Sequence, residues 1–213
     1  MRGVTHAAAG LVVGVALREA TGDPSFWLPA AGMMGGLLPD IDEPNSTVAH
    51  LPGKLRKAVR RSTGRGAGAA LVNLVVSIVT GILEAITVAL ATIVKSVLGH
   101  RGAMHSLTMA MAVTVGTTIG AAALDAMTQA NWGFSVPLLV GPTLGTGYIT
   151  HLVTDGMTKQ GVPLLWPMTN ERIRVVPKCL AATTGGVIDW VVMFVCYAAT
   201  FGLLLADLGR GFL

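Results

Sequence analysis

The sequence predicts an all-α protein, a polytopic bundle of membrane helices, and three observations support this fold class. Hydrophobic residues make up 52% of the 213 residues, charged residues make up 12%, and the mean hydropathy is +0.65. The apolar residues are mainly Ala, Val, Leu, Ile and Met in long runs, with 27 glycines among them, which favours helices packed closely through small residues. Polar residues gather between the runs. A chain this apolar is atypical of soluble domains, and we expect one membrane-embedded domain, 1–213.

Two short apolar segments open the chain. Residues 4–20 are predicted to form a helix that ends at the turn-forming residues 21–24, and residues 26–38 to form a second one that ends before Pro39. Each segment is short for a membrane span, which needs about 20 residues. Together they are expected to form a tilted or partly re-entrant helical hairpin, followed by a polar, basic loop over 41–66.

The longest apolar stretch, residues 67–98, allows three placements. If it crossed the membrane, Asp40 and His105 would lie on opposite faces, whereas the ligands of one metal ion must converge. Thr80-Gly81 divides the stretch into parts of about 14–16 residues, long enough for a hairpin that enters and leaves on one side. A weak polar stripe would also allow a helix on the membrane surface. We expect one of the two non-crossing placements.

Three further apolar runs complete the expected bundle. They lie near 104–127, 134–154 and 184–206, and a polar stretch over 155–180 separates the last two.

The basic residues indicate an orientation. If residues 1–6, 41–103 and 155–180 share one side, that side holds 13 of the 15 basic residues, all but Arg18 and Arg210. The positive-inside rule makes this side cytoplasmic. The net charge of +4 is not evidence for a nucleic-acid partner, because no aromatic residues interleave with the basic ones as a base-stacking surface would need. Contact with anionic lipid headgroups is the expected role of these charges.

Ionisable side chains at the ends of these apolar runs are candidates for function, because such groups are costly at membrane depth. Asp40 and Asp42 follow Pro39 two residues apart, and carboxylates this close repel unless a cation or a proton lies between them. The alternative is that these carboxylates cap a helix or a turn.

A second motif covers residues 99–106 and precedes an apolar run. His105 lies near the expected helix start, where a neutral imidazole can bind metal. His100 and Arg101 would stand outside the helix, where the guanidinium of Arg101 can hold a phosphate or carboxylate with two parallel hydrogen bonds. The alternative is that the motif anchors the chain at the membrane interface.

The third motif pairs His151 with Asp155. Four residues apart on a helix, the two side chains share one face, so they could bind one ion, or Asp155 could orient His151. The alternative is a hydrogen bond between them that only caps the helix. His6 and Asp189, each near the start of an apolar run, could be metal ligands or structural groups. Nitrogen and oxygen donors without thiolates suit Zn²⁺, Mn²⁺ or Fe²⁺, with one or two ions.

At these residues the chain resembles the YdjM-like family of LexA-regulated, membrane-bound metal-dependent hydrolases. The matching stretches are Thr5-His6 and the residues 37–46, 99–107 and 151–167. The resemblance implies an inner-membrane protein of several spans with metal ligands at the positions of His6, Asp40, Asp42, His105, His151 and Asp155. Met104 stands where the family usually has Thr. Family members commonly have Glu near the start of the last helix, and Asp189 stands at that position here. The stretch 67–98 looks like an insertion.

These observations lead us to expect a membrane-embedded metal-dependent hydrolase, with its site toward the cytoplasm, that cleaves a phosphoester of a lipid or lipid-linked substrate. Asp42, His100, Arg101 and His105 are the candidate catalytic residues, beside the metal ligands above and Asp189. The alternative is a non-enzymatic membrane protein, either a metal-ion transporter or a structural partner. A transporter is expected to hold its ligands near mid-membrane, often between repeated halves. The sequence shows no internal repeat, and it leaves the lipid, the metal and the oligomeric state open.

Overall fold

The computed structural model describes residues 1–23, 26–42, 50–64, 66–98, 102–128 and 135–211. These residues form seven α-helices and three short 3₁₀ helices, and the described part of the chain contains no strand, which confirms the all-α fold. Two compact units are present, one made of Met1–Pro39 with Arg101–Leu213 and the other of Asp40–His100. The expectation of a single domain over 1–213 stays a prediction.

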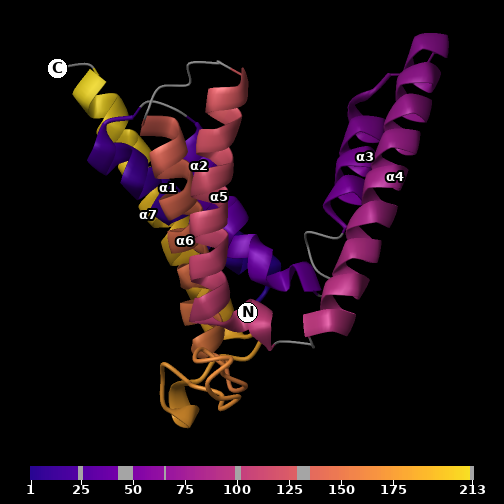
Figure 1. Ribbon diagram of the computed structural model, residues 1–213. Coiled ribbons are helices and arrows are strands. Elements are labelled where there is room, and N and C mark those ends of the chain that lie inside the picture. The colour runs from indigo at the N-terminus through magenta and orange to yellow at the C-terminus, as the bar shows by residue number, and fades with distance from the viewer. Residues whose placement is uncertain (24–25, 43–49, 65, 99–101, 129–134, 212–213) are drawn as a thin grey trace. The chain divides into compact units, whose positions relative to one another are not determined.

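Five helices build the first unit (Figure 1). Helix α1 packs against α2, α6 and α7, while α6 also contacts α2 and α5. The helices are α1 (Gly3–Thr21), α2 (Trp27–Leu37), α5 (Leu107–Thr128), α6 (Ser135–Gly156) and α7 (Val187–Gly211).

The first two helices form the N-terminal hairpin that the sequence predicts. Helix α1 ends at Thr21 because Gly22 adopts a left-handed conformation, with φ of 66°, that only glycine adopts without steric cost. Helix α2 ends at Leu37, and a 3₁₀ helix that includes Pro39 continues the chain as far as Asp42. Pro39 has no N–H to donate, so it cannot cap the carbonyl of Gly36 in the 3₁₀ pattern.

Adjacent glycines let α2 lie against two helices at once. A Cβ atom at Gly36 would lie 2.3 Å from the carbonyl oxygen of His6 in α1. A Cβ atom at Gly35 would lie 2.0 Å from the carbonyl oxygen of Leu144 in α6. Both distances are far below van der Waals contact, so only glycine allows these backbones to approach as they do.

The polar segment between α6 and α7 folds over one end of the helices. The N–H of Lys159 donates to the Ala182 carbonyl at 3.2 Å, and the N–H of Ala182 donates to the Met157 carbonyl at 2.8 Å. Val162 and Ile173 exchange a second pair of backbone hydrogen bonds, of 3.0 and 2.9 Å. The expected polar stretch 155–180 is therefore ordered by its own backbone pairing.

The second unit contains α3 (Leu51–Ser62) and α4 (Ala67–Leu98), which pack against each other. Helix α4 is continuous, so the prediction of a hairpin divided at Thr80-Gly81 is wrong. The Thr80 hydroxyl donates to the Val76 carbonyl at 2.6 Å, which satisfies it inside the helix. One glycine costs a helix only about 1 kcal/mol, which a 32-residue helix can absorb.

Three of the described helices are long and apolar enough to cross a membrane, and the qualifying segments are Gly68–Ala85, Leu107–Thr128 and Val187–Gly209. The last two confirm the runs expected near 104–127 and 184–206. Helix α6, expected as a span near 134–154, forms as a helix but does not reach this level of hydropathy.

We predict that Gly36→Ala lowers the stability of the purified protein, because the new methyl group would overlap the His6 carbonyl and force α1 away from α2. Overpacking of this kind costs about 1–3 kcal/mol, which a thermal unfolding curve in detergent would detect. Gly116→Ala is the matched control, since a Cβ atom at Gly116 in α5 meets nothing within 4 Å. Equal melting temperatures for the two variants would contradict the close-approach argument.

Candidate metal centre

Four of the predicted ligands come together at one end of the first unit. His6 lies in the first turn of α1, His151 and Asp155 in the last turns of α6, and His105 at the end of a 3₁₀ helix, Ala103–His105. All four side chains are buried, and the three histidines are at most 1% exposed. Residues that are as many as 149 positions apart therefore meet away from solvent.

The three imidazoles surround the Asp155 carboxylate. His6 Nε2 lies 3.2 Å from Asp155 Oδ1, while Nε2 of His105 and of His151 lie 3.7 and 3.8 Å from Oδ2. The rings of His6 and His151 stack with their centroids 3.7 Å apart, and the ring of His105 meets that of His151 edge-on at 5.3 Å. The spacing of His151 and Asp155 along α6 places them on one face, as the sequence predicts.

The backbone of α2 fixes the orientation of His151. Its Nδ1 atom lies 2.7 Å from the carbonyl oxygen of Gly36. A carbonyl can only accept a hydrogen bond, so Nδ1 carries the proton, and in the neutral ring Nε2 holds the lone pair. This carbonyl is near the end of α2, where helix carbonyls lack a partner within the helix.

A threonine hydroxyl fixes His6 in the same way. The Thr154 hydroxyl donates to the His151 carbonyl at 2.9 Å, so its oxygen accepts from His6 Nδ1 at 2.8 Å. The Nε2 atom of neutral His6 therefore also carries a lone pair. Although Asp155 Oδ1 lies within reach, the direction of the Nε2 bond is unfavourable, and this atom makes no hydrogen bond within the described part of the chain.

The donor set fits a cation. Burial raises the pKa of the Asp155 carboxyl, whereas contacts with its neighbours, the Met1 ammonium among them, lower that pKa below its ordinary range. The Met1 ammonium supplies positive charge at Oδ1 of this carboxylate, and a metal ion would supply it between the carboxylate and the lone pairs of His6 and His151. Ligand atoms of His6, His151 and Asp155 all lie within 4.8 Å of one another, which suits a shared metal ion.

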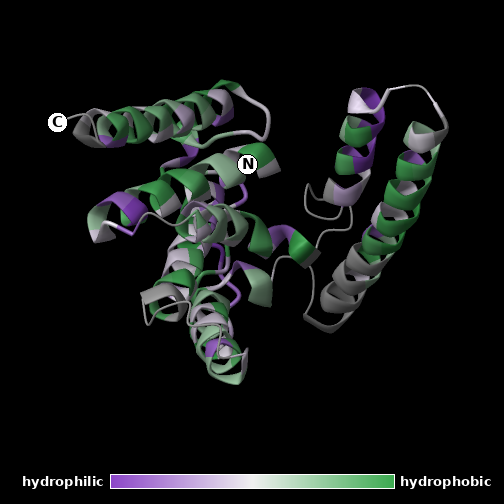
Figure 2. Ribbon diagram, turned by 90° about the horizontal axis from the view of Figure 1, so that it is seen from above, coloured by the Kyte–Doolittle hydropathy of each residue, from purple (hydrophilic) through white to green (hydrophobic). Residues whose placement is uncertain are grey.

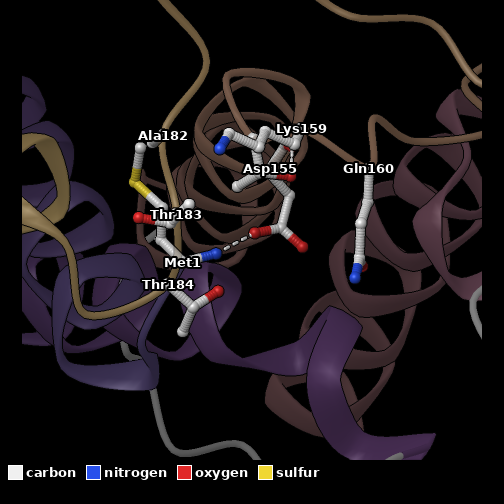
Figure 3. Close-up of a pocket in the computed structure, with 8 residues that line it drawn as sticks. Met1, Asp155, Lys159, Gln160, Ala182, Thr183 and Thr184 are labelled. Carbon is white, nitrogen blue, oxygen red and sulfur yellow. Dashed lines mark hydrogen bonds and ion pairs between the residues drawn. The ribbon is translucent and has the colours of Figure 1, made fainter.

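A cavity of about 200 Å³ opens beside Asp155 (Figure 3). The Met1 amino group lines it and contacts Asp155 Oδ1, and Lys159, Gln160 and Thr184 stand around it. The remaining lining residues are Thr158, Ala182 and Thr183. The segment between α6 and α7 therefore supplies most of the wall, including a cationic side chain.

Asp189 has contacts of a different kind. Its buried carboxylate accepts hydrogen bonds from the Thr5 hydroxyl at 2.6 Å, the Gly185 N–H at 2.7 Å and Arg2 Nε at 3.0 Å. The Arg2 guanidinium in turn lies 3.7 Å over the ring of Trp190. These contacts join the starts of α1 and α7, next to His6. A metal-binding role for Asp189 stays a prediction.

For the other predicted site residues, convergence on this centre stays a prediction. Asp40 and Asp42 belong to the second unit, so their convergence with the four buried ligands stays a prediction. The Asp42 side chain, His100 and Arg101 lie outside the part of the chain that the structure describes.

Sequence reasoning did not identify the groups that orient the ligands. Thr154 lies inside the third motif, where its position between His151 and Asp155 was the one available signal. Gly36 and Arg2 gave no signal, because each acts through a contact that exists only after the helices have packed.

A comparison with protein-family models decides the family. The model of the YdjM inner membrane protein family matches residues 1–208. The chain belongs to this family. Membership agrees with the resemblance at the motifs and with the exposed apolar side chains of the candidate spans in α5 and α7, such as Met111 at 69% and Phe201 at 63% exposed. Such side chains suit contact with lipid, and the chain is an inner-membrane protein. No curated protein and no solved structure matches it.

We predict that Thr154→Val weakens metal binding, because valine keeps the shape of threonine but removes the oxygen that holds His6 in its metal-binding tautomer. Loss of such an orienting partner typically costs 10–100-fold in metal affinity, so we expect a loss of about that size. Titration of the metal-free protein with Zn²⁺ or Mn²⁺ against a competing chelator would measure it.

Thr146→Val serves as the control for this titration. Thr146 lies in the same helix, is exposed, and donates only to the Pro142 carbonyl. Unchanged affinity in Thr154→Val, or an equal loss in both variants, would contradict the assigned role of Thr154.

Proposed function

We propose that this protein is a membrane-embedded, metal-dependent hydrolase that cleaves a phosphoester of a lipid or lipid-linked substrate with activated water at the cytoplasmic side of the membrane. The observation that carries the proposal is the orientation of His6 and His151. Both have their Nδ1 proton committed to a neighbour, and both direct Nε2 toward a buried carboxylate.

The chemistry of the ligands supports a catalytic metal. His6, His105, His151 and Asp155 offer nitrogen and oxygen donors, which suit Zn²⁺, Mn²⁺ or Fe²⁺. A divalent ion held there would lower the pKa of a bound water and polarise a phosphoryl oxygen. On sequence grounds we keep Asp40 and Asp42 in the proposed ligand set, and with them the option of a second ion.

The residues of this chain provide the remaining functions of such a site. Thr154 and Gly36 hold two imidazoles in the tautomer that can bind metal. Burial of the histidines limits access of bulk water, and the cavity beside Asp155 leaves room for a small polar group. Lys159 on the wall of that cavity can pair with a phosphate. Arg101, four residues before His105 in the sequence, is proposed to bind the same phosphate.

The position of the centre supports an enzyme over a transporter. His6 lies near the start of α1, and Asp155 lies one residue before the end of α6. The ligands therefore lie at one end of the helices, beside a polar segment, where a lipid headgroup can reach them while its chains stay in the membrane. A transporter is expected to hold its ligands near mid-membrane.

We predict that His151→Ala and Asp42→Asn abolish hydrolysis of a phosphorylated lipid while the protein still inserts into the membrane. Each change removes a proposed donor to the ion that activates water, and the barrier should rise by several kcal/mol. Arg101→Ala should mainly raise KM, because we assign Arg101 to the phosphate. Purified protein with a measured metal content, assayed against a panel of lipid phosphoesters, tests this.

Thr146→Val again serves as a matched control that should keep full activity. If His151→Ala and Asp42→Asn retain normal metal content and turnover, the assignment of these residues is wrong. If the wild-type protein binds metal but cleaves none of the lipids, the transporter or structural-partner alternative moves ahead.

We predict a cytoplasmic position for the centre, because 13 of the 15 basic residues lie on the expected inner side. In a chain with Cys179 and Cys196 replaced by serine, we place single cysteines at Arg172, in the exposed segment after α6, or at Met127, at the far end of α5. A membrane-impermeant maleimide added to spheroplasts should label Met127→Cys alone. Labelling of Arg172→Cys alone would reverse the orientation.

A further inference from the structure

Helix α3 carries an unusual concentration of positive charge. Its twelve residues include no acidic side chain and five basic ones, which are Lys54, Arg56, Lys57, Arg60 and Arg61. The helix is amphipathic, and its charged side chains are at least partly exposed. The proposed metal centre uses none of these residues.

Helix α3 lies antiparallel along the first half of α4. The Thr63 hydroxyl donates to Asn73 Oδ1 at 3.1 Å near one end of the contact. Near the other end, Arg56 Nη2 lies 3.8 Å from Glu84 Oε2, and His50 Nδ1 lies 3.1 Å from Glu84 Oε1. The basic helix therefore runs beside residues 73–84 of α4.

This arrangement conflicts with a transmembrane position for the same part of α4. Residues 73–84 lie inside Gly68–Ala85, the segment that is apolar enough to cross a membrane. A 12-residue helix is about 18 Å long, and the hydrocarbon core is about 30 Å thick. If Gly68–Ala85 crossed, several charges of α3 would lie at hydrocarbon depth, which is strongly unfavourable without partners. A position at the membrane surface removes the conflict.

The surface of the hairpin has two different sides. Leu71, Leu74, Ile78 and Ile82, spaced three or four residues apart along α4, are 53–63% exposed. Asn73, Ser77 and Glu84 on the same helix are near α3. Figure 2 shows the contrast between the hydrophilic residues of α3 and the hydrophobic residues of α4. The apolar side can enter the acyl region while α3 remains at the level of the headgroups.

A cavity between the two helices has the chemistry of an anion site. Its volume is about 420 Å³, and Arg56, Lys57, Arg60 and Ser77 line it. Three cations and a hydroxyl donor match a group with several negatively charged oxygens, such as a phosphate.

We propose that the α3–α4 hairpin lies on the membrane surface and binds anionic phospholipid, with the headgroup phosphate between Arg56, Lys57, Arg60 and Ser77. The exposed apolar side of α4 rests in the boundary between headgroups and acyl chains. The hairpin thereby attaches to acidic lipid by contacts that are independent of the metal centre.

Electron paramagnetic resonance on the full-length protein tests this. With Cys179 and Cys196 replaced by serine, a spin label is attached at Ile78→Cys in α4 or at Ile119→Cys in α5. The protein is reconstituted in phosphatidylcholine vesicles with or without phosphatidylglycerol, and accessibility to oxygen and to a water-soluble nickel complex reports depth. We expect an interfacial depth for the Ile78 label that depends on phosphatidylglycerol, and a deep position for the Ile119 label in both lipids.

A triple variant, Arg56→Gln with Lys57→Gln and Arg60→Gln, should lose the phosphatidylglycerol dependence while the Ile119 label keeps its depth, which shows that the bundle remains folded. The control, Arg172→Gln with Arg174→Gln and Lys178→Gln, removes the same charge elsewhere and should keep the dependence. Inorganic phosphate at matched ionic strength should not shift the Ile78 label.

Three results would overturn the proposal. The first is a mid-bilayer depth for the Ile78 label, which would mean that α4 crosses. The second is an equal loss of the phosphatidylglycerol dependence in both triple variants, which would indicate that the total positive charge of the protein, and not a specific site, causes the dependence. The third is a shift of the label by free phosphate as large as that by phosphatidylglycerol, which would indicate a soluble anion site.

Discussion

The hydrogen bond from His151 Nδ1 to the Gly36 carbonyl is the contact on which the candidate centre depends. It forms because Gly35 and Gly36 let α2 approach its neighbours without side chains between them. Pro39 contributes as well, since it has no N–H to offer this carbonyl. The bond sets the tautomer of His151, while the backbone carbonyl of His151 in α6 accepts from Thr154, which orients His6. The small residues near the end of α2 therefore determine both how the helices pack and how the candidate ligands are oriented.

Much of the fold could be predicted because apolar runs define helices, and Gly22 marks the end of α1 as expected. The Thr80-Gly81 division failed because one glycine is a weak helix breaker in a long apolar helix. At the centre, residue types and the spacing of His151 and Asp155 pointed to candidate ligands that the fold brings together. The partners of those ligands could not be predicted, because a carbonyl of α2 or a hydroxyl of α6 becomes a partner only through tertiary packing.

Asp189 illustrates how hydrogen bonds accommodate a buried carboxylate in a membrane protein. A hydroxyl, a backbone N–H and a guanidinium all donate to it, so its charge is compensated by hydrogen bonds from three separate groups. An ionisable residue near a membrane span is a reasonable candidate for function, yet here the described contacts also explain the residue as a link between α1 and α7. Because Thr5 is adjacent to His6 in α1, this link between α1 and α7 also holds the start of α1, and with it His6, in place.

The wide separation in sequence of the residues that meet at the centre has a consequence for biosynthesis. His6 emerges from the ribosome early, whereas His151 and Asp155 emerge only after α5 and most of α6 have been made. Asp189, the partner of Arg2 and Thr5, is synthesised later still. During this interval α1 and α2 can already pair, since their glycine contacts need no later segment. The N-terminal hairpin can therefore serve as the template on which α6 and then α7 assemble, and a truncated chain without α6 would lack two of the proposed ligands, His151 and Asp155.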